Sequence, residues 1–162
     1  MKTIILVFIL IPSFSFSQFI KSNQSDSFTQ QKRIVTKSVN MSFDVFANSS
    51  VDEISYYTIN ETINIVLYGE GKGSTILKDD IALLITDKDT VVIKSIGLQA
   101  PNRNYYEHRY FISKDDLIRL SKNKLVSVRR YTEQGIFNFP IKEKFQSNLM
   151  KLSDALLKEM DK

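Results

Sequence analysis

The sequence predicts an α+β fold: an antiparallel β-sheet or half-barrel of about 6–8 strands, with one short helix and a long C-terminal amphipathic helix packed on the sheet. Two patterns carry this prediction. Over most of the chain, short runs of β-branched and aromatic residues alternate with polar residues at the period of a strand, and turn residues separate the runs. Near the C-terminus, the apolar period changes to that of a helix.

The first residues, 1–17, have the features of a secretory signal peptide. Lys2 forms a short positive region, and residues 4–11 are an unbroken apolar run. Ser15 and Ser17 occupy the small-residue positions of a cleavage site, so we expect cleavage after Ser17. The apolar run is too short for a transmembrane anchor, which needs about 20 residues. We therefore expect an exported protein, either periplasmic or secreted, with no transmembrane anchor.

The rest of the chain divides into two parts. Residues 18–31 are rich in Ser, Gln and Asn and poor in large apolar residues, so we expect a flexible leader. Residues 32–162 are long enough to bury a core and are expected to form a single α+β domain.

The predicted strands follow one another with short turns between them. They are expected at residues 39–45, 54–59, 63–67, 81–86, 90–96, 105–112, 125–131 and 136–141. Residues 87–89 and 133–135 supply hairpin turns. Residues 69–74 are expected to form a glycine-rich turn and residues 98–104 a loop.

Two helices complete the fold. Ser113, with Asp116 three residues later, is a capping pattern that starts a short helix ending near Asn123. The long helix is expected from about residue 143 to 160, with an apolar stripe at Phe145, Leu149, Leu152, Leu156 and Met160. The stripe is expected to cover the sheet, and docking on a partner or a membrane is the alternative. In its element order, the chain resembles the pleckstrin-homology superfold.

The composition excludes several kinds of site. The 162 residues contain no cysteine, which excludes disulfides, thiolate metal sites and cysteine nucleophiles. The single histidine, His108, is too little for a structural zinc site, and neither a GxSxG elbow nor an EF-hand loop is present. A cysteine-free exported domain is ordinary among bacterial envelope proteins. We therefore expect a small bacterial protein with no cofactor and no metal.

The charge is distributed unevenly. Residues 18–97 contain 8 Lys and Arg against 10 Asp and Glu, whereas residues 98–162 contain 13 against 8. A basic second half can attract an anionic ligand or an acidic partner, although interspersed charges are also typical of an ordinary solvated surface. No nucleic-acid-binding module is recognisable, so no nucleic-acid partner is expected.

The segment from residue 105 to residue 111 is the richest in candidate binding side chains. On a strand, alternate residues share a face, so Tyr106, His108 and Tyr110 would point one way and Arg109 the other. Tyr and Arg dominate interface hot spots, and if the strand at 125–131 is a neighbour, its Arg and Tyr would complete one patch. The alternative is ordinary cross-strand packing with Glu107–Arg ion pairs. The candidate binding residues are Tyr106, His108, Arg109, Tyr110, Arg129, Arg130 and Tyr131.

The function expected from these observations is non-enzymatic binding of an envelope or extracellular protein or of an anionic ligand. One alternative is a small hydrolase or isomerase that uses carboxylates and His108. The other is a structural accessory domain of an envelope assembly, with the C-terminal helix as its docking element. Neither the oligomeric state nor the strand order is predicted.

Overall fold

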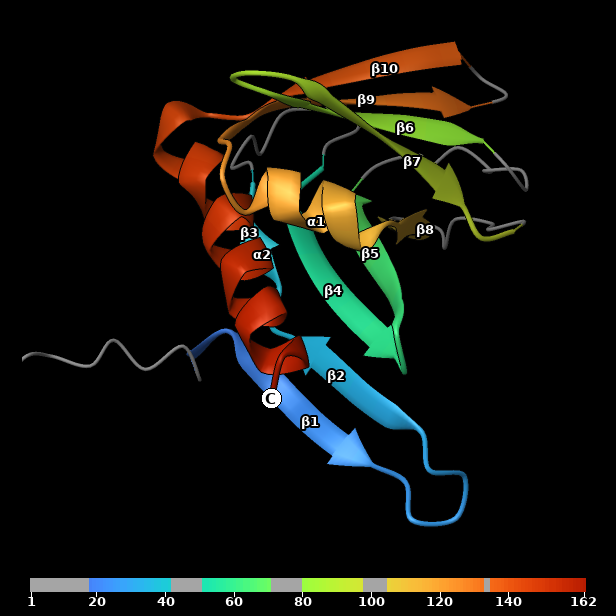
Figure 1. The fold of residues 1–162 in the computed structure, drawn as a ribbon. Helices are drawn as coiled ribbons and strands as arrows, with labels where there is room; N and C mark the ends of the chain where they lie inside the picture. The colour runs from blue at the N-terminus through green and yellow to red at the C-terminus, as the bar shows by residue number, and fades with distance from the viewer. Residues whose placement is uncertain (1–17, 42–50, 71–79, 98–104, 133–134) are drawn as a thin grey trace, which may run out of the picture.

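The computed structural model describes residues 18–41, 51–70, 80–97, 105–132 and 135–162, and of residues 70, 105 and 106 it describes the backbone alone. The described residues form a bent antiparallel sheet whose concave side is covered by two helices (Figure 1). The predicted α+β fold class is confirmed, with ten strands among the described residues in place of about 6–8.

The strands are β1 (Ile20–Ser25), β2 (Lys32–Thr36), β3 (Val39–Asn40), β4 (Glu53–Ile59), β5 (Thr62–Glu70), β6 (Ile81–Thr86), β7 (Thr90–Ser95), β8 (Tyr105–Ile112), β9 (Leu125–Thr132) and β10 (Gly135–Pro140). The helices are α1 (Lys114–Leu120) and α2 (Gln146–Met160), and the 3₁₀ turn η2 (Glu143–Phe145) leads into α2. The strand order is β1-β2-β4-β5-β8-β7-β6-β9-β10, with β3 paired to β4. Among the described strands, β1 and β10 therefore form the two open ends of the sheet.

Seven of the predicted strands are observed with small changes at their ends. These are residues 54–59, 63–67, 81–86, 90–96, 105–112, 125–131 and 136–141, which correspond to β4 to β10 in order. The turn around residue 135 needs Gly135, whose φ of +128° is unfavourable for other residues.

Other predictions fall partly or wholly outside the described residues. Of the strand predicted at 39–45, the described part is β3, and of the turn predicted at 69–74, Gly69 and Glu70 lie in β5. The signal peptide at 1–17 and the loop at 98–104 lie outside the described residues.

The segment at 18–31 differs from the flexible leader that its composition predicts. Residues 20–25 form β1, which pairs with β2 in an antiparallel hairpin (Figure 1). Asn23 Nδ2 also donates a hydrogen bond to Glu159 Oε1 of α2 at 2.6 Å. Backbone pairing holds this strand in place more than burial does, because most of its side chains are exposed. Hydrophobic patterning could not reveal such a polar strand.

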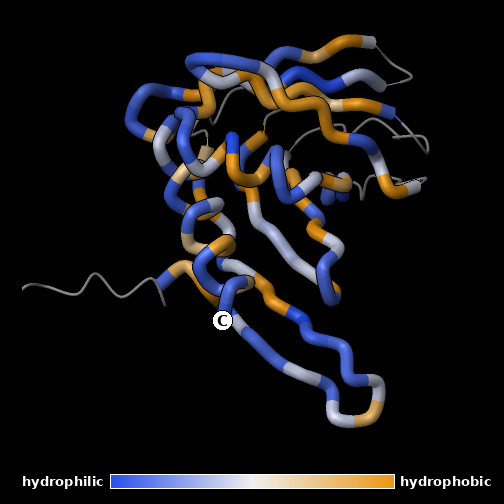
Figure 2. Tube along the Cα trace, viewed as in Figure 1, coloured by the Kyte–Doolittle hydropathy of each residue, from blue (hydrophilic) through white to orange (hydrophobic). Residues whose placement is uncertain are grey.

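The hydrophobic core lies between the concave face of the sheet and the helices. From α2 it includes Leu149, Leu152 and Leu156, all fully buried, and from α1 it includes Leu117 and Leu120. Apolar and polar residues alternate along both helices, whereas the arms of the β1–β2 hairpin are mostly hydrophilic (Figure 2). The predicted helix at 143–160 and its packing on the sheet are confirmed.

A buried hydrogen bond joins α2 to the sheet. The hydroxyl groups of Tyr56 on β4 and Ser153 on α2 are 2.8 Å apart, and Ser153 Oγ donates to the Leu149 carbonyl at 2.8 Å. Each buried hydroxyl therefore has a partner, which removes the penalty of burying it unsatisfied.

Helix α1 begins as its capping pattern predicts. The Ser113 side chain accepts a hydrogen bond from the Asp116 backbone N–H at 3.0 Å, and Ser113 Oγ donates to Asp116 Oδ2 at 2.7 Å. The helix ends at Leu120, three residues before the predicted end at Asn123.

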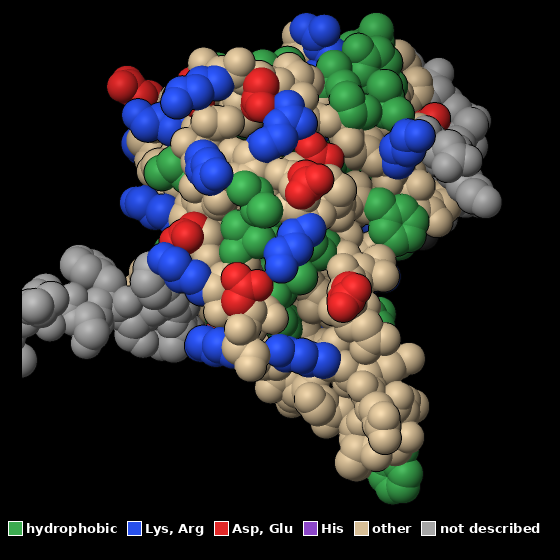
Figure 3. Space-filling model, viewed as in Figure 1, with side chains coloured by type: hydrophobic (Ala, Val, Ile, Leu, Met, Phe, Trp, Pro, Cys, Tyr) green, Lys and Arg blue, Asp and Glu red, His purple; other side chains and the backbone are tan. Residues whose placement is uncertain are grey.

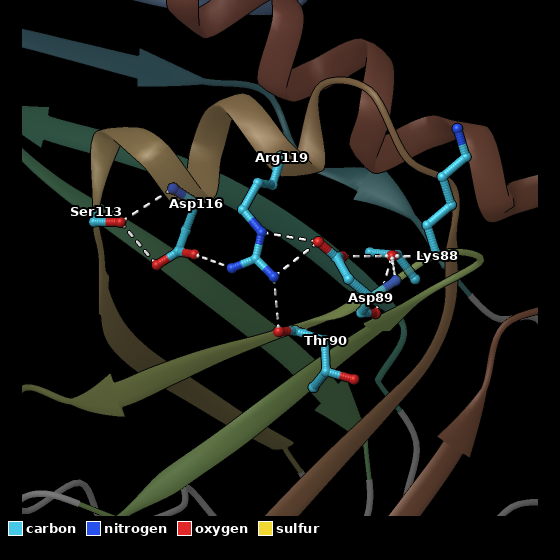
Figure 4. Close-up of polar contacts among 7 residues, drawn as sticks. Lys88, Asp89, Thr90, Ser113, Asp116 and Arg119 are labelled. Carbon is cyan, nitrogen blue, oxygen red and sulfur yellow. Dashed lines mark hydrogen bonds and ion pairs between the residues drawn. The ribbon is translucent and has the colours of Figure 1, made fainter.

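Arg119 attaches α1 to the β6–β7 hairpin (Figure 4). Its guanidinium approaches Asp89 Oδ2 at 2.7 Å and Asp116 Oδ1 at 2.7 Å, and it donates to the Thr90 carbonyl at 3.2 Å. The neighbouring Thr86 hydroxyl binds Asp89, so the turn itself is ordered by side chains. We call Arg119, Asp89, Asp116 and Thr90 the α1 clasp.

Within the described part of the chain, no helix has both the length and the apolar character needed to cross a bilayer.

Candidate binding surface

The sheet register divides the candidate residues between its two faces. Directly paired residues of an antiparallel sheet share a face. Tyr110 pairs with Ile65, and Arg130 pairs with Ala82, so both lie on the concave, core side together with His108. His108 and Tyr110 are 0% exposed and Arg130 is 2% exposed.

These three inner residues come together without being on neighbouring strands. Strands β7 and β6 separate β8 from β9. The bend of the sheet still places the Arg130 guanidinium near enough to His108 for its charge to act on the imidazole. Burial and this positive charge together lower the pKa of His108 to about 3. His108 is therefore neutral at physiological pH and has little tendency to accept a proton.

The same environment acts on Tyr110 and Arg130. Burial raises the pKa of Tyr110 to about 12, against the opposing effect of Arg130. The Arg130 guanidinium carbon lies 5.7 Å from the centroid of the Phe139 ring, in a cation–π arrangement. These inner residues form a polar part of the core and do not reach a partner that docks on the outside of the domain.

Arg109 lies on the outer face, as the alternation along β8 predicts. Its Nη2 is 2.7 Å from Glu107 Oε1, and its guanidinium carbon lies 6.0 Å from the centroid of the Tyr57 ring. The hydrogen bonds to Glu107, partly opposed by desolvation, raise the pKa of Arg109. The predicted Glu107–Arg ion pair is therefore present, but it joins two residues of one strand and does not bridge two strands.

Arg129 and Tyr131 also lie on the outer face. Arg129 pairs with Leu83 on β6 and with Asn138 on β10, and its Nε donates to Asn138 Oδ1 at 2.8 Å. Tyr131 pairs with Ile136 and is half-buried. The backbone of Tyr106 pairs with Gly69, and its side chain lies outside the described part of the structure.

The register also shows that the outer face is continuous across the sheet. One row runs through Tyr57, Asn64, Phe111, Lys94 and Ile81, each paired with the next. A second row runs through Val92, Leu83, Arg129 and Asn138, and Ile136 follows two residues from Asn138 on β10. We call the residues Leu83, Val92, Lys94, Arg109, Phe111, Arg129 and Ile136 the outer-face patch.

The outer-face patch exposes large apolar side chains. Val92 is 51% exposed, Phe111 49% and Ile136 65%. Val92 and Lys94 alternate with the buried Val91 and Ile93 on β7. This period of two is the sequence signal that predicts that Val92 and Lys94 share the exposed face. The candidate list from the sequence omitted these residues because it selected Tyr, His and Arg by chemical type.

The patch is also positively charged. Lys94 and Arg129 make no ion pair with any described residue, whereas Glu107 is neutralised by Arg109. Within the described ranges, no group of three or more His, Asp and Glu residues is placed to hold a metal ion. The outer face of the bent sheet thus offers a surface that is both apolar and cationic.

Comparisons with protein-family models, with curated proteins and with solved structures find no match. The resemblance in element order to the pleckstrin-homology superfold thus has no support from a solved structure.

Proposed function

We propose that this protein is a non-catalytic binding domain that holds an acidic partner protein on the outer-face patch. The observation that carries the proposal is the exposure of Val92, Phe111 and Ile136 on the same continuous sheet face as Lys94 and Arg129. Apolar side chains gain free energy when a partner covers them, and the cations select a partner of opposite charge.

A protein fits this surface better than a small anion does. The patch extends over strands β6 to β10 and combines the exposed Phe111, Val92 and Ile136 with arginine side chains, and aromatic and arginine side chains are enriched at interface hot spots. A small anion would instead need several converging donors, and the row positions of Lys94 and Arg129 place them on different strands with Leu83 and Val92 between.

The two alternative functions receive less support from the structure. His108 is buried with a pKa of about 3, so it is a poor general base at neutral pH. Helix α2 buries Leu149, Leu152 and Leu156 in its own core and so cannot offer that stripe to an assembly.

Export of the protein belongs to the proposal, supported by the signal-peptide pattern at residues 1–17. The intact mass of the protein recovered from the envelope or culture fluid should correspond to a chain beginning at Gln18. A protein found only in the cytosol with residues 1–17 attached would contradict export.

The binding proposal is tested by capture with charge-matched variants. Tagged chain from Gln18 to Lys162 is incubated with envelope and culture-fluid proteins of the source cells. The parent is compared with a Lys94→Glu/Arg129→Glu double variant and with a control, Lys122→Glu/Lys151→Glu, which makes the same charge change at exposed helix-side positions. Both variants should keep the parent's circular dichroism spectrum and melting behaviour.

We expect an acidic protein that the parent and the control retain and the outer-face variant loses. Its affinity, measured with the purified partner, should fall about 30-fold or more for Phe111→Ser, as for an interface hot spot. Binding of the partner by the parent protein should also weaken as salt is added, because exposed charges are screened. Identical capture by all three proteins would exclude the outer-face patch as the binding surface.

A further inference from the structure

Gln18 is the first described residue, and removal of the signal peptide is expected to make it the N-terminus. Cleavage after Ser17 turns the backbone nitrogen of Gln18 into a free α-amine. An N-terminal glutamine differs from most other N-terminal residues, because its side-chain amide lies within reach of its own α-amine and a stable lactam ring can close. The expected cleavage therefore creates a reactive terminus.

The fold holds the chain in place directly after Gln18. The Lys37 backbone N–H donates to the Phe19 carbonyl at 2.8 Å. Ile20 pairs with Thr36 at the start of β1. The side chains of Phe19 and Ile20 are partly buried against the hydrophobic core. Gln18 is thus the single residue between the expected cleavage point and the part of the chain that the fold holds.

The side chain of Gln18 is available for reaction. Gln18 is exposed, and its side chain makes no hydrogen bond or ion pair with any other described residue. Rotations about the bonds of Gln18 itself bring its α-amine to its amide carbon, so ring closure leaves the contacts of Phe19 in place. An α-amine loses its proton more readily than a lysine amine does, so part of it is neutral and nucleophilic at neutral pH.

We infer that Gln18 cyclises to an N-terminal pyroglutamate once the signal peptide is removed. A bond forms between the α-nitrogen and Cδ of Gln18, and the bond between Cδ and Nε2 breaks. A proton passes from the α-nitrogen to Nε2, which leaves as ammonia, so the reaction consumes no oxidant, reductant or other reactant. Cyclisation rests on the proposed export, because the α-amine exists only after cleavage at Ser17.

The reaction is confined to Gln18 and to one cleavage position. Internal glutamines, such as Gln24 on β1, cannot form this lactam because their backbone nitrogens belong to peptide bonds. Cleavage after Ser15 would leave Phe16 at the terminus, and its side chain has no amide. The mass of the mature chain therefore reports the cleavage position and the cyclisation at the same time.

Cyclisation protects one end of the sheet. Among the described strands, β1 forms an open end of the sheet, and its hairpin with β2 extends away from the body of the domain (Figure 3). Most side chains of β1 are exposed, so the apolar contact of this segment with the core is concentrated at Phe19 and Ile20, next to the terminus. Proteolysis concentrates at chain ends, and aminopeptidases need a free α-amine, which the lactam lacks. The cyclised terminus therefore preserves the contact at the base of the hairpin.

Intact mass spectrometry of the native protein, recovered from the envelope or culture fluid of the source cells, is the first test. We expect a mass that is lower by one ammonia molecule than that of the uncyclised chain from Gln18 to Lys162. Edman degradation should give no sequence until pyroglutamyl aminopeptidase has removed the lactam from the unfolded protein, and it should then begin at Phe19. The tandem mass spectrum of the first peptide should place the loss on residue 18.

Two variants, expressed with residues 1–17 in the same cells, separate this site from other losses of ammonia. Gln18→Ala keeps Ser15 and Ser17 and should be cleaved at the same point, but it cannot form the lactam, so we expect its full mass and a free N-terminus. Gln24→Ala, on β1 of the same hairpin, is the matched control and should lose ammonia like the parent. An added aminopeptidase should remove residue 18 from Gln18→Ala and leave the parent intact, whereas equal digestion of the two would contradict the protection.

The remaining outcomes distinguish a failure of cyclisation from a failure of export. A chain that begins at Gln18 with its full mass and a free α-amine would overturn cyclisation and leave export intact. A chain that still carries residues 1–17 would contradict both. A loss of ammonia that persists in Gln18→Ala would place the reaction at another amide and would overturn the assignment to Gln18.

Discussion

At the scale of single residues, burial decides what each polar side chain can do. Arg109 and Arg130 lie on strands of the same sheet, but Arg109 faces solvent with Glu107 while Arg130 faces the core beside Phe139. The buried guanidinium acts on His108, which it helps to keep neutral. One step along β8, from His108 to Arg109, therefore separates a buried side chain from one that faces solvent.

The buried His108 predicts a loss of stability in acid. Its pKa in the folded state, about 3, lies below the unfolded value of 6.5, so the unfolded chain binds the proton more tightly. The stability that depends on neutral His108 is complete above pH 6.5 and is lost as the pH falls toward 3. The loss amounts to about 1.4 kcal/mol for each pH unit well below 6.5.

Urea unfolding of the parent and of His108→Gln, at several pH values between neutrality and pH 4, measures this effect. The difference in free energy of unfolding, parent minus variant, should fall steadily below pH 6.5. Titrating carboxylates cancel in that difference, because both proteins carry them. A difference that does not change with pH would show that His108 is protonated in the folded state.

At the scale of elements, each helix is attached to the sheet in a different way. Helix α2 is held by buried apolar side chains and by the Tyr56–Ser153 hydrogen bond. Helix α1 adds the α1 clasp, whose ion pairs are open to solvent. Burial gives the larger stabilisation, since exposed ion pairs are screened by water and salt.

Shortening one buried side chain of α2 should therefore be strongly destabilising. Leu152→Ala removes a fully buried side chain and should lower the free energy of unfolding by about 2–5 kcal/mol. Leu157→Ala, a change at a half-buried position of the same helix, is the matched control and should have a smaller effect. Denaturant unfolding followed by circular dichroism measures both, and equal losses would contradict the packing described for α2.

Breaking the α1 clasp should affect the β6–β7 hairpin locally. In Arg119→Gln, Asp89 and the Thr90 carbonyl lose their contact with α1. We expect faster hydrogen exchange of the amides at residues 86–90, while the melting temperature changes little. Lys122 is exposed and lies two residues after the end of α1, so Lys122→Glu is a control that should leave this exchange unchanged. Unaltered exchange in Arg119→Gln would mean that the turn is ordered without the α1 clasp, by the hydrogen bonds of Thr86 with Asp89 and of Asp87 with Lys124.

At the scale of the whole molecule, the bent sheet depends on a helix that comes last in the chain. Because α2 covers the concave face, residues far apart in sequence, such as Tyr56 and Ser153, share one core. Deletion of residues 143–162 should therefore leave a chain without cooperative thermal unfolding and with collapsed amide dispersion in NMR spectra. A sheet that stayed folded without α2 would revive the alternative in which this helix docks on an assembly.

The sequence alone predicts the local features: the period of two that marks β4 to β10, the cap of α1 at Ser113 and the stripe of α2. These follow from interactions within a few residues. It also showed that Arg109 and His108 face opposite ways, because alternation is a property of one strand.

Which of those faces is buried follows from the tertiary structure, because it depends on where α2 and the distant strands pack. It placed β7 and β6 between β8 and β9, so that the predicted patch divided into a core cluster around Arg130 and the outer-face patch. It also shows that the polar β1 joins the sheet through backbone hydrogen bonds with β2. The side-chain pattern of β1 does not predict this pairing. The pairing of strands depends on the free energy of the whole core. It therefore cannot be predicted from any single segment.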